Sequence, residues 1–209
     1  MYSALLKSIA QLPVYHIDKA RRALLQPIIS FIQQKVNNRE PININFICTH
    51  NSRRSHFAQV WAQVAAAYYT IPQVACYSGG TEATALHPQV AGTLAAQGFR
   101  VFNLTAADNP VYAIKYCDEA VPIIGFSKVY DHPFNPTTAY AAIMTCSQAD
   151  NDCPLITGAE KRLPLTYEDP KIVDGTPRQE QVYTERSVQI ATELFYIFSM
   201  ISNTPWSQD

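Results

Sequence analysis

A cysteine and an arginine six positions apart are the residues of this sequence whose types and spacing most directly suggest chemistry. Cys48 ends a run of β-forming apolar residues, and Arg54 and Ser55 open a segment with helical periodicity. In a strand–loop–helix turn, the loop's backbone N–H groups and the positive end of the helix converge on one point and attract an anion. Arg54 can donate two parallel hydrogen bonds to a tetrahedral oxyanion. We therefore predict that this loop binds phosphate or arsenate.

The residues of this loop also have the types that covalent chemistry needs. The field of the anion site favours the thiolate form of Cys48, which makes Cys48 a candidate nucleophile. Ser55 can donate a hydrogen bond to the thiolate, and Asn51 can hold the shape of the loop. A buried structural cysteine is the alternative, but the strand–loop–helix context favours the functional interpretation. The residues predicted to surround the oxyanion are Thr49, His50, Asn51, Ser52, Arg53 and Arg54.

A second pair of cysteines follows an apolar segment farther along the chain. Cys146 and Cys153 bracket a polar stretch, and a proline follows Cys153. Zinc binding explains them poorly, because no further Cys or His pair at metal-site spacing accompanies them. A structural disulfide would be unusual in a reducing compartment. A redox relay fits best, since a flexible polar segment lets each sulfur approach and leave its neighbour during thiol–disulfide exchange.

The apolar pattern predicts the elements that position these residues. A helix is expected from Ser55 to Tyr69, directly after the loop. The paired glycines Gly79 and Gly80 follow a predicted strand and permit close approach of another backbone. The predicted strands are Ile42–Ile47, Gln73–Ser78, Phe99–Leu104 as a candidate third strand, and Tyr140–Thr145.

Two segments are predicted to be additions within a single domain spanning residues 1–209. Residues 1–40 read as a helical extension of a core at residues 41–209, and we expect them to pack on the sheet rather than contact a partner. Residues 109–136 are rich in proline and aromatic residues, and two apolar runs at Val111–Tyr116 and Ile123–Tyr130 predict an inserted hairpin. The apolar stripe of the extension is expected at Ala20, Leu24, Ile28, Ile32 and Val36.

Composition excludes several classes of function. The 209 residues are 47% hydrophobic and 16% charged, with a formal net charge of −1, which predicts neither nucleic acid nor an anionic membrane as a partner. The first residues lack the apolar run of a signal peptide, so a reducing cytoplasm is expected. We predict no metal and no cofactor. Of the five cysteines, Cys76 and Cys117 have no role that the sequence indicates.

The stretch Phe46–Ser55, with Ala58 and Trp61 after it, resembles the low-molecular-weight protein tyrosine phosphatase superfamily. Its Cys-Thr-x-Asn-Ser-x-Arg-Ser form is most similar to the thioredoxin-coupled arsenate reductases. Those reductases carry a second and a third redox cysteine at the separation of Cys146 and Cys153, also followed by proline. The resemblance implies an α/β fold in which a four-stranded parallel sheet has helices on both faces. It also implies a thioredoxin-like reductant as partner.

The resemblance further implies a general acid in an Asp-Pro pair, and Asp169 occupies the matching position. The implied reaction begins with attack of Cys48 on arsenate, continues through disulfides of Cys146 and Cys153, and ends with transfer to thioredoxin. A phosphomonoesterase using the same loop and acid is the alternative enzyme, and a non-catalytic oxyanion-binding or redox-sensing module is the third hypothesis. Two departures from the family pattern support the third hypothesis, namely His50 in place of glycine and Gln59 in place of glutamate.

Overall fold

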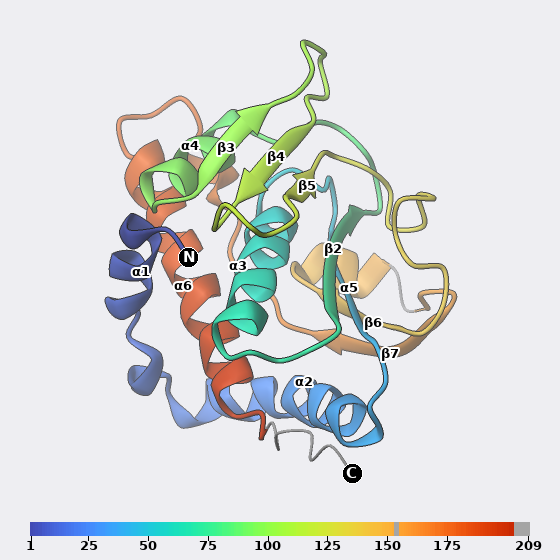
Figure 1. Cartoon of the computed structure of the whole chain (residues 1–209). Helices are drawn as coiled ribbons and strands as arrows, with labels where there is room; N and C mark the ends of the chain where they lie inside the picture. Colours follow the sequence, from blue (N-terminus) through green and yellow to red (C-terminus); the bar gives the residue numbers. More distant parts are fainter. Residues whose placement is uncertain (153–154, 203–209) are drawn as a thin grey trace.

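Four parallel strands form the main sheet of the computed structural model, which describes residues 1–152 and 155–202. The strand order is β2-β1-β6-β7, with every neighbouring pair parallel (Figure 1). The predicted four-stranded parallel sheet is confirmed. Its members are β1 (Ile42–Cys48), β2 (Val74–Gly80), β6 (Tyr140–Met144) and β7 (Ala159–Pro164).

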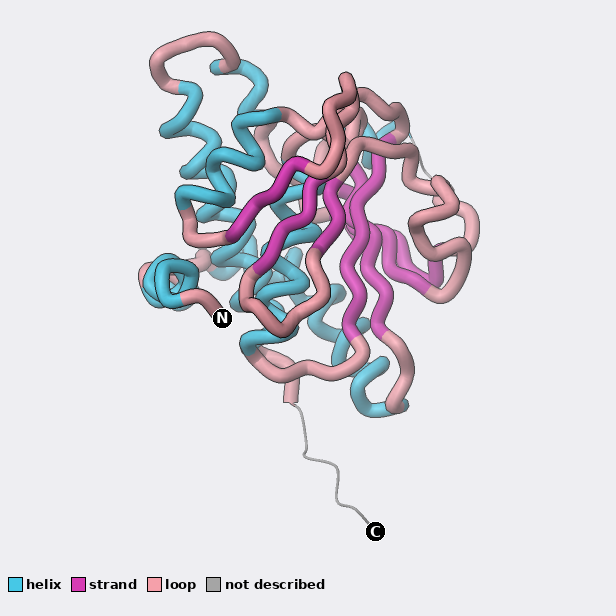
Figure 2. The backbone as a smooth tube through the Cα atoms, turned by 45° about the horizontal axis from the view of Figure 1, so that its top comes forward, coloured by secondary structure: helices cyan, strands magenta, loops and turns pink. Residues whose placement is uncertain are grey.

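The predicted membership of this sheet is wrong at one strand. Phe99–Leu104 was the candidate third strand, but β3 (Arg100–Asn103) belongs to a separate antiparallel sheet with β4 (Tyr112–Lys115) and β5 (Ile123–Gly125). Three of the four β3 side chains are exposed, whereas strands of parallel sheets are normally covered on both faces. The predicted hairpin therefore exists and gains β3 as a third strand, and Figure 2 shows both sheets.

Helices cover both faces of the main sheet, as predicted. On one face, α2 (Lys19–Asn38), α3 (Arg54–Tyr68) and α6 (Gln179–Ser199) enclose the larger buried cluster. Because side chains alternate along a strand, Ile44 and Phe46 of β1 point into that cluster, whereas Ile47 points to the opposite face. There it packs in a smaller cluster with Ala149 of α5 (Ser147–Asp152).

The N-terminal extension is helical, as expected, and packs against the core. It comprises α1 (Ser3–Ala10), a short turn η1 (Val14–His16) and α2, which contacts α6, β1 and β7. The predicted apolar stripe is wrong at Ala20 and Leu24, which are both exposed, Leu24 by 50%. A strict four-residue repeat drifts around a helix with 3.6 residues per turn, so the buried side follows the three- and four-residue spacing instead. Its buried apolar residues are Leu25, Ile28, Ile29, Phe31 and Ile32.

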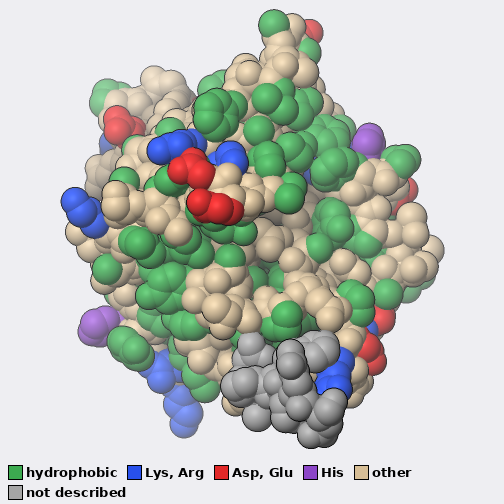
Figure 3. Space-filling view, viewed as in Figure 1, with side chains coloured by type: hydrophobic (Ala, Val, Ile, Leu, Met, Phe, Trp, Pro, Cys, Tyr) green, Lys and Arg blue, Asp and Glu red, His purple; other side chains and the backbone are tan. Residues whose placement is uncertain are grey.

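The remaining elements connect the two sheets to the C-terminal helix. Helix α4 (Pro88–Ala96) contacts α6 and β3, and a short turn η2 (Pro170–Val173) precedes α6. Figure 3 shows a group of acidic and basic side chains side by side on one face. Arg100 and Asp118 form an exposed ion pair at 2.7 Å. Within residues 1–152 and 155–202, no helix is long and apolar enough to cross a membrane.

Candidate active site

The predicted oxyanion loop connects β1 to α3. Strand β1 ends at Cys48 and α3 begins at Arg54, so the loop lies at the positive end of a helix. Asn51 adopts a left-handed backbone conformation, with φ of 43°, which asparagine tolerates better than most residues. This conformation turns the chain within the loop, and Cys48 and Arg54 then face one small pocket. The pocket is lined by Cys48, His50, Ser52, Arg53, Arg54 and Asp169.

The sulfur of Cys48 has a hydrogen-bonding partner in Ser55. The Cys48 Sγ and Ser55 Oγ atoms are 3.1 Å apart, and Cys48 is 3% exposed. The amide Nδ2 of Asn51 donates to the same Ser55 oxygen at 2.9 Å. Because Asn51 occupies the oxygen as an acceptor, the hydroxyl proton of Ser55 is available to the sulfur. The arrangement predicted for Cys48, Asn51 and Ser55 is therefore present.

Arg54 presents its guanidinium to the same pocket. Its Nη1 donates to the backbone oxygen of Tyr167 at 2.9 Å, and its Nη2 contacts Asp169 Oδ2 at 2.6 Å. Its Nε is buried and has no hydrogen-bond partner among the described residues. A buried donor without a partner is costly, and an oxyanion in the loop would supply the missing acceptor.

Asp169 lines the same pocket as the loop residues and contacts Arg54 there. The free volume there is about 10 Å³, roughly the room that one water molecule needs. A tetrahedral oxyanion would therefore displace the Asp169 carboxylate from Arg54. The backbone N–H of Lys171 donates to the other carboxylate oxygen at 3.0 Å, which fixes the carboxylate from its outer side.

Cys146 reaches this site from the neighbouring strand. Its sulfur lies 3.4 Å from the hydroxyl of Thr49, and it accepts a hydrogen bond from the backbone N–H of Ala149 at 3.3 Å. Cys146 and Cys48 pack in the same buried cluster. The structure thus brings two of the three predicted redox cysteines to one place. Cys153, the third, lies outside the described residues.

Comparison of the sequence with family models and with curated proteins found no match. Comparison of the structure did find similar proteins. The low-molecular-weight phosphotyrosine phosphatase of Vibrio cholerae has a TM-score of 0.52 and 12% identity, over 76% of this chain and 95% of its own. The corresponding phosphatase of T. tengcongensis has a TM-score of 0.51 and 14% identity, over 76% and 98%.

This chain has the low-molecular-weight phosphatase fold. An arsenate reductase in the phosphate-binding state is also similar, with a TM-score of 0.47 and 18% identity, over 77% of this chain and 99% of its own.

Within this phosphatase fold the last glycine of β2, Gly80, approaches the loop closely, whereas its neighbour Gly79 lies against Tyr130. The backbone N–H groups of Thr81 and Glu82 donate to the Cys48 and Thr49 carbonyls at 3.1 and 2.8 Å. A Cβ added to Gly80 would lie 2.7 Å from both Asn51 N and Thr49 O. Gly80 is therefore needed so that the backbone after β2 can support the anion loop from one side.

The side chains of His50 and Arg53 have other partners. His50 faces Glu82, with 3.7 Å between Nε2 and Oε2. Arg53 donates from Nε to the Tyr183 hydroxyl and from Nη2 to Asp174 Oδ2, each at 2.5 Å. The Arg53 side chain therefore ties the loop to Tyr183 of α6 and to Asp174 before that helix.

Two buried ionisable residues beside the loop were not identified from the sequence. His56 contacts the Asn51 oxygen through Nε2 at 2.9 Å and the Ser78 hydroxyl through Nδ1 at 3.2 Å. Burial, with a further contribution from the charge of Lys128, lowers the pKa of His56 to about 3. Burial also lowers the pKa of Lys128 to about 7. The only sequence signal for His56 is its position two residues after Arg54, and Lys128 has no such signal.

The two other cysteines lie away from this pocket's lining residues. Cys76 is in β2, and burial raises the pKa of its thiol. Cys117 lies in the turn between β4 and β5 and is partly exposed. Among the residues that the structure describes, no three His, Cys, Asp or Glu side chains are grouped as metal ligands would be.

Proposed function

We propose that this chain is an arsenate reductase that uses a cysteine relay and a thioredoxin-like dithiol. The observation that carries the proposal is the position of Cys146, which lies 3.4 Å from the Thr49 hydroxyl in the anion loop. A phosphatase that works through one cysteine has no use for a second sulfur at this point. A relay requires one.

In the first step, the Cys48 thiolate attacks arsenate held by the loop and by Arg54. A bond forms between sulfur and arsenic, and one arsenate oxygen leaves with a proton from Asp169. The contact between Asp169 Oδ2 and Arg54 Nη2, at 2.6 Å, supports this role, because the carboxyl group lies where the oxyanion would bind. When an oxyanion replaces Asp169 as the hydrogen-bond partner of Arg54, the Asp169 carboxyl group lies next to the departing oxygen.

In the second step, the Cys146 thiolate attacks the sulfur of Cys48. The sulfur–arsenic bond breaks, its electron pair stays on arsenic, and arsenic(V) leaves as arsenite. The Cys153 thiolate then attacks Cys146 and releases Cys48 as a thiolate. The dithiol of a thioredoxin-like protein reduces the resulting Cys146–Cys153 disulfide, so two electrons pass from the reductant to arsenic overall.

The test is a coupled assay with purified chain, thioredoxin, thioredoxin reductase and reduced nicotinamide cofactor. Arsenate-dependent oxidation of the cofactor is expected for the wild type and should be lost in Cys146→Ser and in Cys153→Ser. Cys117→Ser is the matched control and should behave as the wild type. Absence of arsenate-dependent oxidation with the wild type would refute the reductase.

A phosphomonoesterase is the second candidate, supported by the fold and by the pairing of Cys48 with Asp169. It would use the same first step on a phosphate ester and release the phosphocysteine to water. The substrate of such an esterase is less suited to be phosphotyrosine. The resembling phosphatases commonly carry tyrosines after the acid to contact an aryl group, and this chain has Ile172 there, which is 86% exposed. Hydrolysis of p-nitrophenyl phosphate that is unaffected by Cys146→Ser, together with no arsenate reduction, would favour the esterase.

A further inference from the structure

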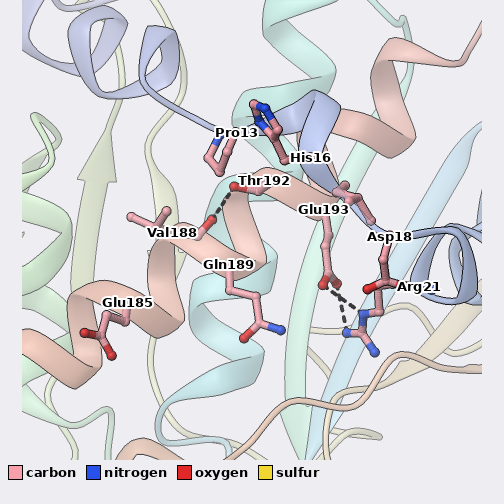
Figure 4. Close-up of a pocket in the computed structure, with 10 residues that line it drawn as sticks. Pro13, His16, Asp18, Arg21, Glu185, Val188, Gln189, Thr192 and Glu193 are labelled. Carbon is pink, nitrogen blue, oxygen red and sulfur yellow. Dashed lines mark hydrogen bonds and ion pairs between the residues drawn. The ribbon is translucent and has the colours of Figure 1, made fainter.

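One arginine of the N-terminal extension is held by the C-terminal helix. Arg21 of α2 forms a two-pronged ion pair with Glu193 of α6, with Nε–Oε1 at 2.8 Å and Nη2–Oε2 at 2.9 Å (Figure 4). The Glu193 side chain is 5% exposed and that of Arg21 is 18% exposed. Arg21 also lies next to the N-cap of its own helix, where its backbone N–H donates to Asp18 at 2.8 Å. The guanidinium is therefore fixed in position and direction.

The same guanidinium contacts the segment that carries the proposed general acid. Its Nη2 donates to the backbone oxygen of Thr166 at 3.1 Å, and its Cζ lies 5.1 Å from the centre of the Tyr167 ring. Arg21 thus holds two successive residues, one through the backbone and one through the ring. Asp169 follows two residues after Tyr167.

The contacted segment is also the one that orients Arg54. The backbone oxygen of Tyr167 accepts from Arg54 Nη1 at 2.9 Å, and Asp169 meets Arg54 Nη2 at 2.6 Å. On its other side, the Tyr167 N–H donates to the backbone oxygen of Thr145, directly after β6. A displacement of Tyr167 would therefore move the attachment of Asp169, whereas Arg54 stays anchored in α3.

Packing alone does not account for Arg21. The extension already buries Leu25, Ile28 and Ile32 against the core, and these side chains supply apolar stabilisation. A largely buried ion pair gives little net stability relative to apolar residues of similar size, because both charges lose hydration. The ion pair does more to fix geometry, because two parallel hydrogen bonds between arginine and carboxylate set orientation as well as distance.

We propose that Arg21 is a positioning residue for the reaction, acting through Tyr167 to hold Asp169 in its working geometry. This inference rests on the proposed function, because it concerns the acid of that reaction. It gives the N-terminal extension a part in catalysis without contact between Arg21 and the oxyanion.

The position of Arg21 also makes it suitable for substitution. A cleft of about 450 Å³ opens beside the ion pair, lined in part by His16, Gln189 and Thr192, as Figure 4 shows. Water from this cleft can hydrate Glu193 when the arginine is removed. Arg21→Gln is therefore expected to fold, and its glutamine can still donate one hydrogen bond to Glu193.

The test compares two esters that differ in their need for a general acid. p-Nitrophenolate leaves without a proton, whereas phenolate requires one. In Arg21→Gln, hydrolysis of p-nitrophenyl phosphate should fall no more than about threefold, and that of phenyl phosphate by about tenfold or more. Arsenate reduction, whose leaving oxygen also needs a proton, should fall like phenyl phosphate hydrolysis.

Arg22→Gln is the matched control. The Arg22 guanidinium bonds to the Ile17 and Tyr15 carbonyls at 2.7 and 3.0 Å, within the extension. This variant should show no preference between the two esters. Equal losses on both esters in Arg21→Gln, or the same discrimination in Arg22→Gln, would overturn the proposal.

Amide hydrogen exchange separates failure of this inference from failure of the proposed function. Exchange in residues 165–169 should accelerate about tenfold in Arg21→Gln and stay unchanged in Arg22→Gln. A wild type that turns over neither arsenate nor either ester would refute the proposed function, and the catalytic role of Arg21 with it. If the wild type is active but exchange is unchanged in Arg21→Gln, Arg21 does not restrain residues 165–169 and the positioning role is refuted by itself.

Discussion

The Thr49 hydroxyl lies 3.4 Å from the Cys146 sulfur, and this contact joins the residues that follow two neighbouring strands. Strands β1 and β6 are parallel, with Ile47 opposite Met144, and the Thr145 N–H donates to the Ile47 oxygen at 2.7 Å. Parallel strands end at the same edge of a sheet, so the loops after them meet. The pairing of β1 with β6 therefore places Cys146 beside the anion loop.

The first prediction concerns the disulfide that this arrangement favours. When Cys153→Ser is treated with arsenate, the relay should stop after its second step and accumulate a Cys48–Cys146 disulfide. Mass spectrometry of peptides from a non-reducing digest would identify the bond. Cys76→Ser is the control, since the Cys76 thiol is buried in β2, and it should leave the pattern of the wild type unchanged. A disulfide from Cys48 to Cys117, or no disulfide, would contradict the relay.

The second prediction concerns the hydrogen bond between Ser55 and Cys48. Ser55→Ala removes the hydroxyl 3.1 Å from the sulfur, and a hydrogen bond to a charged group contributes roughly 1.5–3 kcal/mol. Alkylation of Cys48 by iodoacetamide at neutral pH should therefore slow about tenfold. Ser147→Ala, an exposed position after Cys146, should leave the rate unchanged. Equal alkylation rates in Ser55→Ala and the wild type would mean that the hydroxyl does not stabilise the thiolate.

Local patterns located most of the anion loop from the sequence. A buried strand, a cysteine, an arginine six residues later and a helical periodicity are all contained in one stretch, so short-range rules apply. Cys146 was also found locally, because it follows the apolar run Tyr140–Met144. The relation of Asp169 to Arg54 required the resemblance, since an Asp-Pro pair is common in turns.

Features that depend on distant pairing were missed or misplaced. Strand β7 (Ala159–Pro164) has the sequence Ala-Glu-Lys-Arg-Leu-Pro, and its side chains are exposed or only partly buried. It pairs at the edge of the sheet with β6 and so does not need the apolar run that marks a central strand. Arg21 gave no local signal either, because its partners Thr166 and Glu193 are far along the chain.

The third prediction compares two glycines. A Cβ at Gly80 would lie 2.3 Å from Glu82 O and 2.7 Å from Asn51 N, so backbone must shift in Gly80→Ala. Because that backbone belongs to the anion loop, phosphate affinity measured by calorimetry should fall about tenfold or more, with a stability loss of about 1–3 kcal/mol. In Gly92→Ala, a Cβ meets nothing within 4 Å, and helix propensity should raise stability by about 0.5–1 kcal/mol. Normal phosphate affinity in Gly80→Ala would show that the loop does not depend on this close approach.

The fourth prediction concerns Lys128, whose side chain is buried beside the loop. Lys128 is 2% exposed, and its Nζ lies 4.5 Å from the centre of the Phe126 ring and 5.3 Å from that of Phe134. Burial lowers its pKa from 10.5 to about 7. Below pH 7 the amine is protonated in both the folded and the unfolded chain, so the folded chain bears the full cost of a buried ammonium. Between pH 7 and 10.5 only the unfolded chain holds the proton, so the free energy of unfolding rises with pH.

Lys128→Met removes this dependence and keeps the length and the apolar part of the side chain. Since one pKa unit corresponds to about 1.4 kcal/mol, the variant should be more stable than the wild type at about pH 6, by on the order of 3 kcal/mol. The difference should shrink as the pH rises to about 9, because the wild type is then folded with a neutral amine. Urea unfolding at the two pH values measures this, with Lys7→Met, an exposed position in α1, as the control. If Lys128→Met keeps the pH dependence of the wild type, that dependence does not come from Lys128. His56 is not an alternative source between pH 7 and 9. Its pKa of about 3 lowers the free energy of unfolding only as the pH drops below 6.5.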